Sequence, residues 1–151
     1  MKLYKLTTEE VDTATRFAVD LIAAGKRGTI ESHLIGTLGE MGYAKHINSK
    51  VNLEVYQRGK GDNGSDFNGV QVKTVTWPHG NKELKIQAND RCLKNPSVKT
   101  IALMHVTLSN RSDVYLVGTV SKEAFLRKAE FNPKYDCLVL SEYELNRIDP
   151  L

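Results

Sequence analysis

The sequence predicts a single α/β (α+β) domain, in which helices flank a mixed central sheet that contains an antiparallel β-meander. Two observations support this prediction: apolar residues repeat at helical spacing early in the chain, and from residue 51 they alternate at period two. With 151 residues, the chain is long enough to bury one substantial core. We divide it into an N-terminal helix and connector (1–29), a core (30–120) and a C-terminal part (121–151).

The composition is typical of a globular protein. Hydrophobic residues make up 40% of the chain and charged residues 26%, which excludes a disordered protein. The net charge of +3 permits a polyanionic partner. Cys92 and Cys137 have no metal-ligand spacing and indicate a reducing compartment. Because we find neither an apolar leader nor a run of about 18 apolar residues, we expect a cytoplasmic protein, or one of the host-cell cytoplasm if a phage encodes it.

Two helices are predicted at the start of the chain. Thr7 and Glu10 form a capping-box pattern, after which apolar residues recur at helical spacing. A second helix is predicted over residues 30–47, and it contains three glycines, Gly36, Gly39 and Gly42. Each glycine costs a helix about 1 kcal/mol relative to alanine. We therefore expect these glycines either to break the helix or to let it pack closely against the sheet, Gly36 above all.

Strands follow the two helices. The alternating residues 51–56 predict a first strand. Asn68 and Gly69 then predict a type I′ turn that leads into a second strand over residues 70–77. A short alternating segment over residues 82–87 is the predicted third strand of the meander.

The rest of the chain alternates between strands and short helices, each bounded by turn or capping residues. In chain order we predict a short helix within 88–99, strands over 100–108 and 113–120, a helix over 122–129 capped by Ser121, a strand over 137–140 and a helical turn capped by Ser141.

The predicted hairpin gathers three polar side chains. With the Asn-Gly pair as a two-residue loop, Asp66 lies opposite Gln71, with Cβ atoms about 5 Å apart. Lys73 follows Gln71 by two residues, so it shares that face and lies diagonally near Asp66. We therefore expect an acid, an amide and an ammonium group in one patch. The apolar neighbours point to the other side, toward a core: Phe67, Val70 and Val72.

Such a patch has the groups that metal-assisted phosphodiester hydrolysis needs. Oxygen ligands hold Mg²⁺, which polarises the phosphate and lowers the pKa of a bound water. A neighbouring lysine can orient or deprotonate that water, or offset charge on the phosphate. The amide oxygen of Gln71 can ligate a cation but carries no charge and cannot act as a base. The alternative is a solvated polar face of a hairpin, which is ordinary for such strands.

The stretch DFNGVQVK (residues 66–73) resembles the D…(D/E)xK signature of the PD-(D/E)xK nuclease superfamily, with Gln71 at the second acidic position. The preceding GTLGEMGYAKHI resembles the helix that often supplies an extra acid in this family, which would make Glu40 that acid. The resemblance covers about residues 30–120 and implies a restriction-endonuclease-like fold. It also implies Mg²⁺, with Mn²⁺ able to substitute, held by Asp66, Gln71 and Glu40, while Lys73 activates or orients the attacking water.

The resemblance implies a DNA endonuclease of restriction, homing, junction-resolving or phage DNA-processing type that leaves 5′-phosphate ends and acts as a homodimer on double strands. RNA stays open as a substrate, and Asp62 is an alternative metal ligand. Two other functions stay open: a nucleic-acid-binding module of the same fold that does not cleave, and a structural protein in which the motif is incidental. Four basic residues flank the predicted site and are candidates for phosphate contacts: Arg58, Lys60, Lys82 and Lys85.

Overall fold

The computed structural model describes residues 1–51, 53, 66–77 and 83–147. Its elements, in chain order, are β1 (Lys2–Lys5), α1 (Thr8–Ala23), α2 (Ile30–His46), β2 (Val70–Trp77), β3 (Glu83–Gln87), α3 (Arg91–Lys94), β4 (Thr100–Thr107), β5 (Asn110–Ser121), α4 (Lys122–Lys128), β6 (Glu130–Asn132), β7 (Cys137–Ser141), the 3₁₀ turn η1 (Glu142–Glu144) and β8 (Asn146–Arg147).

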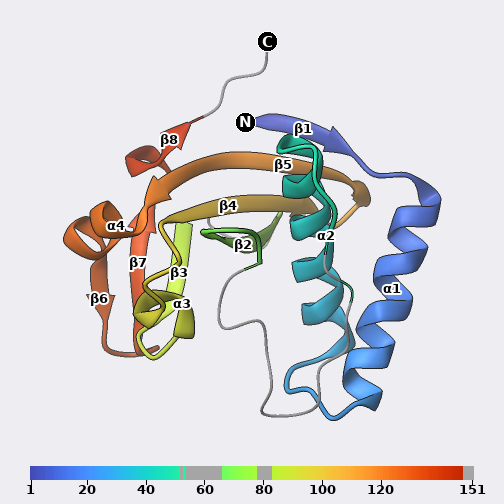
Figure 1. Cartoon of the computed structure of the whole chain (residues 1–151), viewed down its shortest axis with the longest axis horizontal. Coiled ribbons are helices and arrows are strands. Elements are labelled where there is room, and N and C mark those ends of the chain that lie inside the picture. The colour runs from blue at the N-terminus through green and yellow to red at the C-terminus, as the bar shows by residue number, and fades with distance from the viewer. Residues whose placement is uncertain (52, 54–65, 78–82, 148–151) are drawn as a thin grey trace.

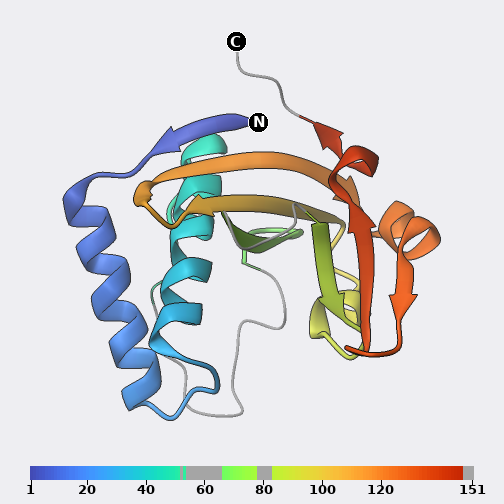
Figure 2. The same ribbon diagram turned by 180° about the vertical axis from the view of Figure 1, so that it is seen from behind.

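The strands form two sheets. The main sheet has the order β1-β5-β4-β2, with β8 beside β5; β2 runs parallel to β4, and the other pairs are antiparallel. The second sheet is antiparallel, with the order β3-β7-β6. Figures 1 and 2 show α1 and α2 at one end of the molecule and the second sheet with α3 and α4 at the other, with β4 and β5 running between them. The predicted fold class, α/β with a mixed central sheet in a single domain, is confirmed.

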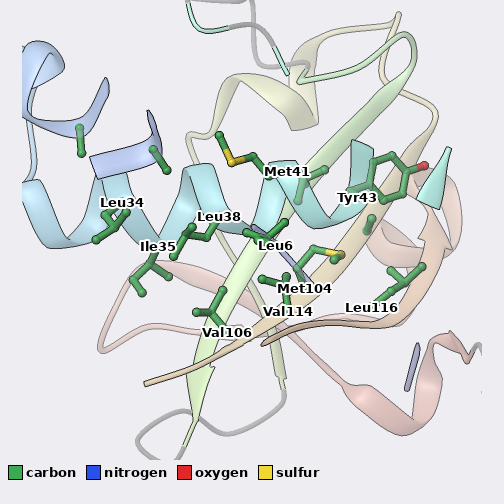
Figure 3. Packing of buried hydrophobic residues seen from close by; sticks show 14 residues of the cluster. Leu6, Leu34, Ile35, Leu38, Met41, Tyr43, Met104, Val106, Val114 and Leu116 are labelled. Carbon is green, nitrogen blue, oxygen red and sulfur yellow. The ribbon is translucent and has the colours of Figure 1, made fainter. Parts of the chain in front are cut away.

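The main sheet separates two buried clusters, and β4 contributes to both. Alternate residues of a strand point to opposite faces, so Met104 lies in the first cluster and Leu103 in the second. The first cluster packs α1 and α2 against the sheet; Figure 3 shows side chains of α2 meeting those of β4 and β5. The second cluster joins the opposite face of the sheet to β3, β7, α3 and α4, with Phe125 fully buried. Because β4 contributes to both clusters, the two clusters pack on opposite faces of the main sheet.

Both long helices begin at capping boxes. Thr7 accepts a hydrogen bond from the backbone N–H of Glu10, whose side chain accepts one from Thr7 N, as predicted. Thr29 and Ser32 form the equivalent pair at the start of α2. This second helix is continuous through its glycines.

Two of the three glycines of α2 allow close packing. A Cβ at Gly39 would overlap the side chain of Thr74 on β2, and one at Gly42 would lie 2.6 Å from Val114 Cγ1 on β5. A Cβ at Gly36 would meet no described atom within 4 Å. The prediction of close approach is therefore right for Gly39 and Gly42 and wrong for Gly36.

Two of the strand predictions need correction, and a third cannot be compared. β3 pairs with β7 instead of β2, so the predicted meander is wrong at its third strand. Leu84 and Ile86 of β3 are buried in the second cluster. The alternating pattern therefore predicted the strand and its buried face correctly, but not the strand with which it pairs. The strand β1, which pairs with β5, was not predicted. The strand predicted over residues 51–56 lies mostly outside the described residues.

The short helices lie where they were predicted. α3 falls within the span 88–99, α4 begins after the N-cap Ser121, and η1 begins after the N-cap Ser141. Within the described residues, we find no helix long and apolar enough to cross a membrane.

Candidate functional site

The turn that precedes β2 organises the candidate site. Phe67 and Val70 form an antiparallel bridge, with Phe67 N–H donating to Val70 O and Val70 N–H to Phe67 O, both at 3.0 Å. Gly69 has a φ of 76°. Asn68 does not have a positive φ, because the non-glycine residues with positive φ in the described part of the chain are Asn48 and Asp136. A type I′ turn needs positive φ at both central residues, so the predicted turn type is wrong although its position is right. Positive φ at the second central residue alone is the pattern of a type II turn.

The strand β2 presents Gln71 and Lys73 on one face, as predicted. Gln71 lies beside Ile101 and Lys73 beside Leu103 in the parallel register, and both β4 residues belong to the second cluster. The expected apolar face of the hairpin is also confirmed, since Val72 belongs to the first cluster and two neighbours pack against it: Phe67 and Val70. The amide and the ammonium group therefore face the second sheet, and the apolar residues face α2.

Asp66 lies against the backbone of the same strand. Its Oδ2 accepts a hydrogen bond of 2.8 Å from the N–H of Val72, the residue between Gln71 and Lys73. The carboxylate is therefore held within one residue of both predicted partners. This contact closes the hairpin at the outer edge of β2 and fixes the Asp66 carboxylate against the backbone of the strand.

Gln71 is an unusual residue for its position, because it is a buried amide with 9% of its surface exposed. Its Nε2 donates to Val72 O at 3.4 Å. Its Oε1 has no hydrogen-bond partner among the described residues. Buried acceptors without a donor are few in folded proteins, and one explanation is an ion that completes the site.

Lys73 makes an ion pair that the sequence did not predict. Its Nζ lies 2.6 Å from Oδ2 of Asp90, while Oδ1 of the same carboxylate accepts a hydrogen bond of 2.9 Å from Cys92 N–H and so caps α3. The two side chains are 25% and 21% exposed. Burial alone would raise the pKa of Asp90, but the hydrogen bonds and the charge of Lys73 outweigh burial and lower this pKa below its usual value.

One sequence signal could have identified Asp90, and the observed topology explains its contact with Lys73. It directly precedes the short helix as a predictable N-cap. It also lies on the connection between the parallel strands β2 and β4, which must return over one face of the sheet. Because Lys73 points to that face, an acid on the connection is a natural partner for it.

A pocket of about 420 Å³ opens beside the ion pair. Its lining combines the β2 lysine with residues of the second sheet: Lys73, Lys85, Gln87, Asp90, Asn132, Tyr135 and Cys137. The structure thus brings Lys85, a predicted phosphate-contacting residue, to the same pocket as Lys73. Lys85 is exposed, and its Nζ is 3.9 Å from Oε2 of Glu83. The other predicted contacts, Arg58, Lys60 and Lys82, lie outside the described residues, as does Asp62.

Glu40 is on the other side of the sheet from this pocket. It lies on α2, and the adjacent Gly39 packs on Thr74, a β2 residue whose side chain points away from the face of Gln71 and Lys73. The structure therefore does not bring Glu40 to the face that carries the amide and the ammonium group. Among the described residues, no group of three or more His, Cys, Asp or Glu side chains is placed to hold a metal ion.

Comparison of the chain with protein-family models, with curated proteins and with solved structures gave no match.

Proposed function

We propose that the protein is a metal-dependent DNA endonuclease whose site is built on Asp66, Gln71 and Lys73. The observation that carries this proposal is the buried Oε1 of Gln71, which has no donor among the described residues and lies on the same strand face as Lys73. A hard divalent cation accepts neutral amide oxygens as well as carboxylates as ligands. An acceptor that finds no protein donor is suited to this role.

The residues present fit such a cation in part. Asp66 accepts the Val72 N–H through one carboxylate oxygen and contributes a negative charge beside β2. Gln71 adds a neutral oxygen. When bound, Mg²⁺ or Mn²⁺ would polarise the scissile phosphate and lower the pKa of the attacking water. Lys73, held in place by Asp90, would offset the charge that develops on the phosphate and orient that water.

The surroundings of Lys73 suit a phosphate backbone. Lys85 lines the same pocket, is exposed, and reaches solvent from the second sheet. Lysines make the sequence-independent phosphate contacts that position a nuclease on DNA and make binding salt-dependent. We expect the protein to act as a homodimer on double-stranded DNA, because each chain contributes one site. RNA added as a competitor in the cleavage experiment tests it as an alternative substrate.

The experiment is cleavage of supercoiled plasmid and branched DNA in Mg²⁺ or Mn²⁺, with EDTA as the blank. Lys73→Ala and Asp66→Asn are the test variants; an asparagine oxygen can still accept the Val72 N–H, so Asp66→Asn removes mainly the charge. Lys5→Ala, at the opposite edge of the main sheet, and Asp20→Asn, on the surface of α1, are the matched controls. We expect metal-dependent nicking or linearisation that both test variants lose and both controls keep. Equal activity in all five proteins would place the activity elsewhere or in a contaminant.

One observation favours a second function, nucleic-acid binding without cleavage. Gln71 carries no charge, and Glu40 lies on the helix that covers the opposite face of β2. Among the predicted acidic ligands that the structure describes, Asp66 is therefore the one that contacts β2 at the hairpin. This alternative predicts salt-sensitive DNA binding by the wild type with no metal-dependent products. Binding that weakens in Lys85→Ala, combined with no cleavage at any metal concentration, would decide for it.

A further inference from the structure

The pocket beside Lys73 extends from the proposed cleavage site onto the second sheet. Its volume of about 420 Å³ falls within the range of about 300–1,000 Å³ that is typical of small-ligand pockets. Its described lining combines Lys73 of β2 and Asp90 of the β2–β4 connection with residues of β3, β6 and β7 and the turn between the last two. The pocket is therefore placed to bind a part of a ligand that lies beyond Asp66 and Gln71.

The charged side chains that line the pocket sum to one positive charge. Lys73 and Lys85 are the lysines of the described lining, and Asp90 is its carboxylate, already paired with Lys73 at 2.6 Å. Lys85 makes a long contact of 3.9 Å with Glu83, and its side chain is 54% exposed. This lining does not suit a cation. It suits an anion with a single charge, which is the charge of a phosphodiester group in a nucleic acid.

The second sheet presents polar side chains to the pocket from one face. Alternate residues of β3 are buried in the second cluster, so Lys85 and Gln87 point to the opposite face. The strand register places Gln87 and Asn132 on either side of Cys137, and all three line the pocket. An amide side chain both donates and accepts hydrogen bonds, as the polar edge of a nucleobase requires.

Tyr135 adds an aromatic ring to the pocket. It lies in the turn between β6 and β7, lines the pocket and is 59% exposed. Nζ of Lys134 lies 5.2 Å from the centroid of this ring, which adds a positive charge beside the pocket. Proteins bind single-stranded nucleic acids with such a combination, because bases stack on aromatic rings while basic groups contact the backbone. A base inside a duplex is already paired and stacked, so the ring suits an unpaired base.

We propose that this pocket binds one unpaired nucleotide of the substrate, with its base stacked on Tyr135 and its phosphodiester group beside Lys85. The inference rests on the proposed function for the identity of the ligand as DNA, and it names branched or single-stranded DNA as the substrate class. Lys73 belongs to both sites, because it lines the pocket and shares a strand face with Gln71. An unpaired nucleotide in the pocket therefore positions the neighbouring backbone beside β2.

The test measures DNA binding by fluorescence anisotropy in EDTA, so that the result does not depend on metal or on cleavage. The labelled probes are a single-stranded oligonucleotide, a blunt duplex of the same length and a duplex with a single-stranded flap. We expect the wild type to bind the single strand and the flap more tightly than the blunt duplex.

Substitutions at Tyr135 test the stacking contact. Tyr135→Ala should lose about 5- to 150-fold in affinity for the single strand, the range for loss of one base–aromatic stack. Tyr135→Phe keeps the ring and should match the wild type. Tyr143→Ala is the matched control, because Tyr143 is 77% exposed on η1 and lies outside the described lining of the pocket.

The salt dependence of binding separates stacking from charge. Lys85→Ala should reduce the slope of log K against log salt concentration by about 0.7, the value of one phosphate contact on a single strand. Tyr135→Ala should keep the wild-type slope, because a stacking contact releases no counterion. Lys5→Ala, at the opposite edge of the main sheet, is the control for Lys85→Ala and should also keep that slope.

The outcomes separate this inference from the proposed function. A single-strand preference that Tyr135→Ala loses, in a protein that cleaves no DNA with metal, supports the pocket and overturns the nuclease assignment. Metal-dependent cleavage, with equal single-strand affinity of wild type and Tyr135→Ala, overturns the pocket alone. Tighter binding of the blunt duplex than of the flap also overturns the pocket. Competition by thymidine monophosphate at the affinity of the oligonucleotide does so too, because the ligand would then be a free nucleotide. Absence of any DNA binding or cleavage overturns both.

Discussion

Gly39 of α2 lies directly against the side chain of Thr74 on β2. A Cβ atom at Gly39 would overlap Thr74 Oγ1 and would lie 2.9 Å from Thr74 Cβ and Cγ2, so even another rotamer of Thr74 could not make room for it. The glycine therefore sets how closely the helix approaches the strand that carries Gln71 and Lys73. This contact connects the packing of the first cluster to the position of the candidate site.

Gly39→Ala should destabilise the protein by about 1–3 kcal/mol, because overpacking outweighs the gain in helix propensity. Gly36→Ala is the matched control on the same helix. An added Cβ there meets no described atom within 4 Å, so this variant should be more stable by about 0.5–1 kcal/mol. Urea unfolding measures both values, and equal effects of the two substitutions would contradict the contact.

Much of the fold was predictable because it is encoded locally. The capping box at Thr7, the helical pattern of residues 30–47 and the strongly apolar, turn-bounded segments of β4 and β5 each specify their own element. The partner of β3 was not predictable in the same way. The alternation of apolar residues places Leu84 and Ile86 on one buried face whether β3 pairs with β2 or with β7. The strand partner is decided by packing in the second cluster, to which distant segments of the chain contribute.

The candidate site was predictable only where it follows strand geometry. The spacing of Gln71 and Lys73 fixes their common face, because side chains alternate along a strand. The position of Glu40 could not be derived in this way. The face of the sheet that α2 covers depends on Gly39, Gly42 and the residues they contact, and these contacts join parts of the chain that are distant in sequence. Asp90 was missed because the ion pair with Lys73 spans 17 residues of sequence.

Gln71→Met tests whether the unpartnered amide serves a ligand. The metal-free variant should be as stable as the wild type or more stable by about 1 kcal/mol, because a buried acceptor without a donor is replaced by an apolar group of similar shape. Added Mg²⁺ should raise the melting temperature of the wild type but not of Gln71→Met. The control is Gln87→Met, at an exposed position of β3 that lines the pocket beside Lys73. A lower melting temperature of metal-free Gln71→Met, with an undiminished Mg²⁺ effect, would count against a metal ligand.

Two substitutions at Asp90 separate its cap from its charge. Asp90→Ala loses both the hydrogen bond to Cys92 N–H and the ion pair with Lys73, whereas Asp90→Asn loses mainly the ion pair. Because loss of an N-cap costs about 1 kcal/mol, Asp90→Ala should be less stable than Asp90→Asn by that amount at neutral pH. Unfolding in urea at pH 7 measures the difference. Identical stabilities would mean that the side chain does not cap α3.

The ion pair between Lys73 and Asp90 should make the free energy of unfolding fall as the pH is lowered below the ordinary pKa of aspartate. Since the folded state lowers the pKa of Asp90, its ionised form contributes stability that is fully present above the ordinary aspartate pKa of about 3.9. This contribution is lost as the pH falls through the lowered pKa of the folded state, because protonation then removes the charge that Lys73 binds. The difference in unfolding free energy between wild type and Asp90→Asn should therefore be constant from about pH 7 to pH 5 and should shrink below about pH 4. Lys73→Met should reduce this pH dependence, and the double variant Lys73→Met with Asp90→Asn should match Lys73→Met at low pH. A difference that instead grows on acidification would show that the pKa of Asp90 is raised in the folded protein.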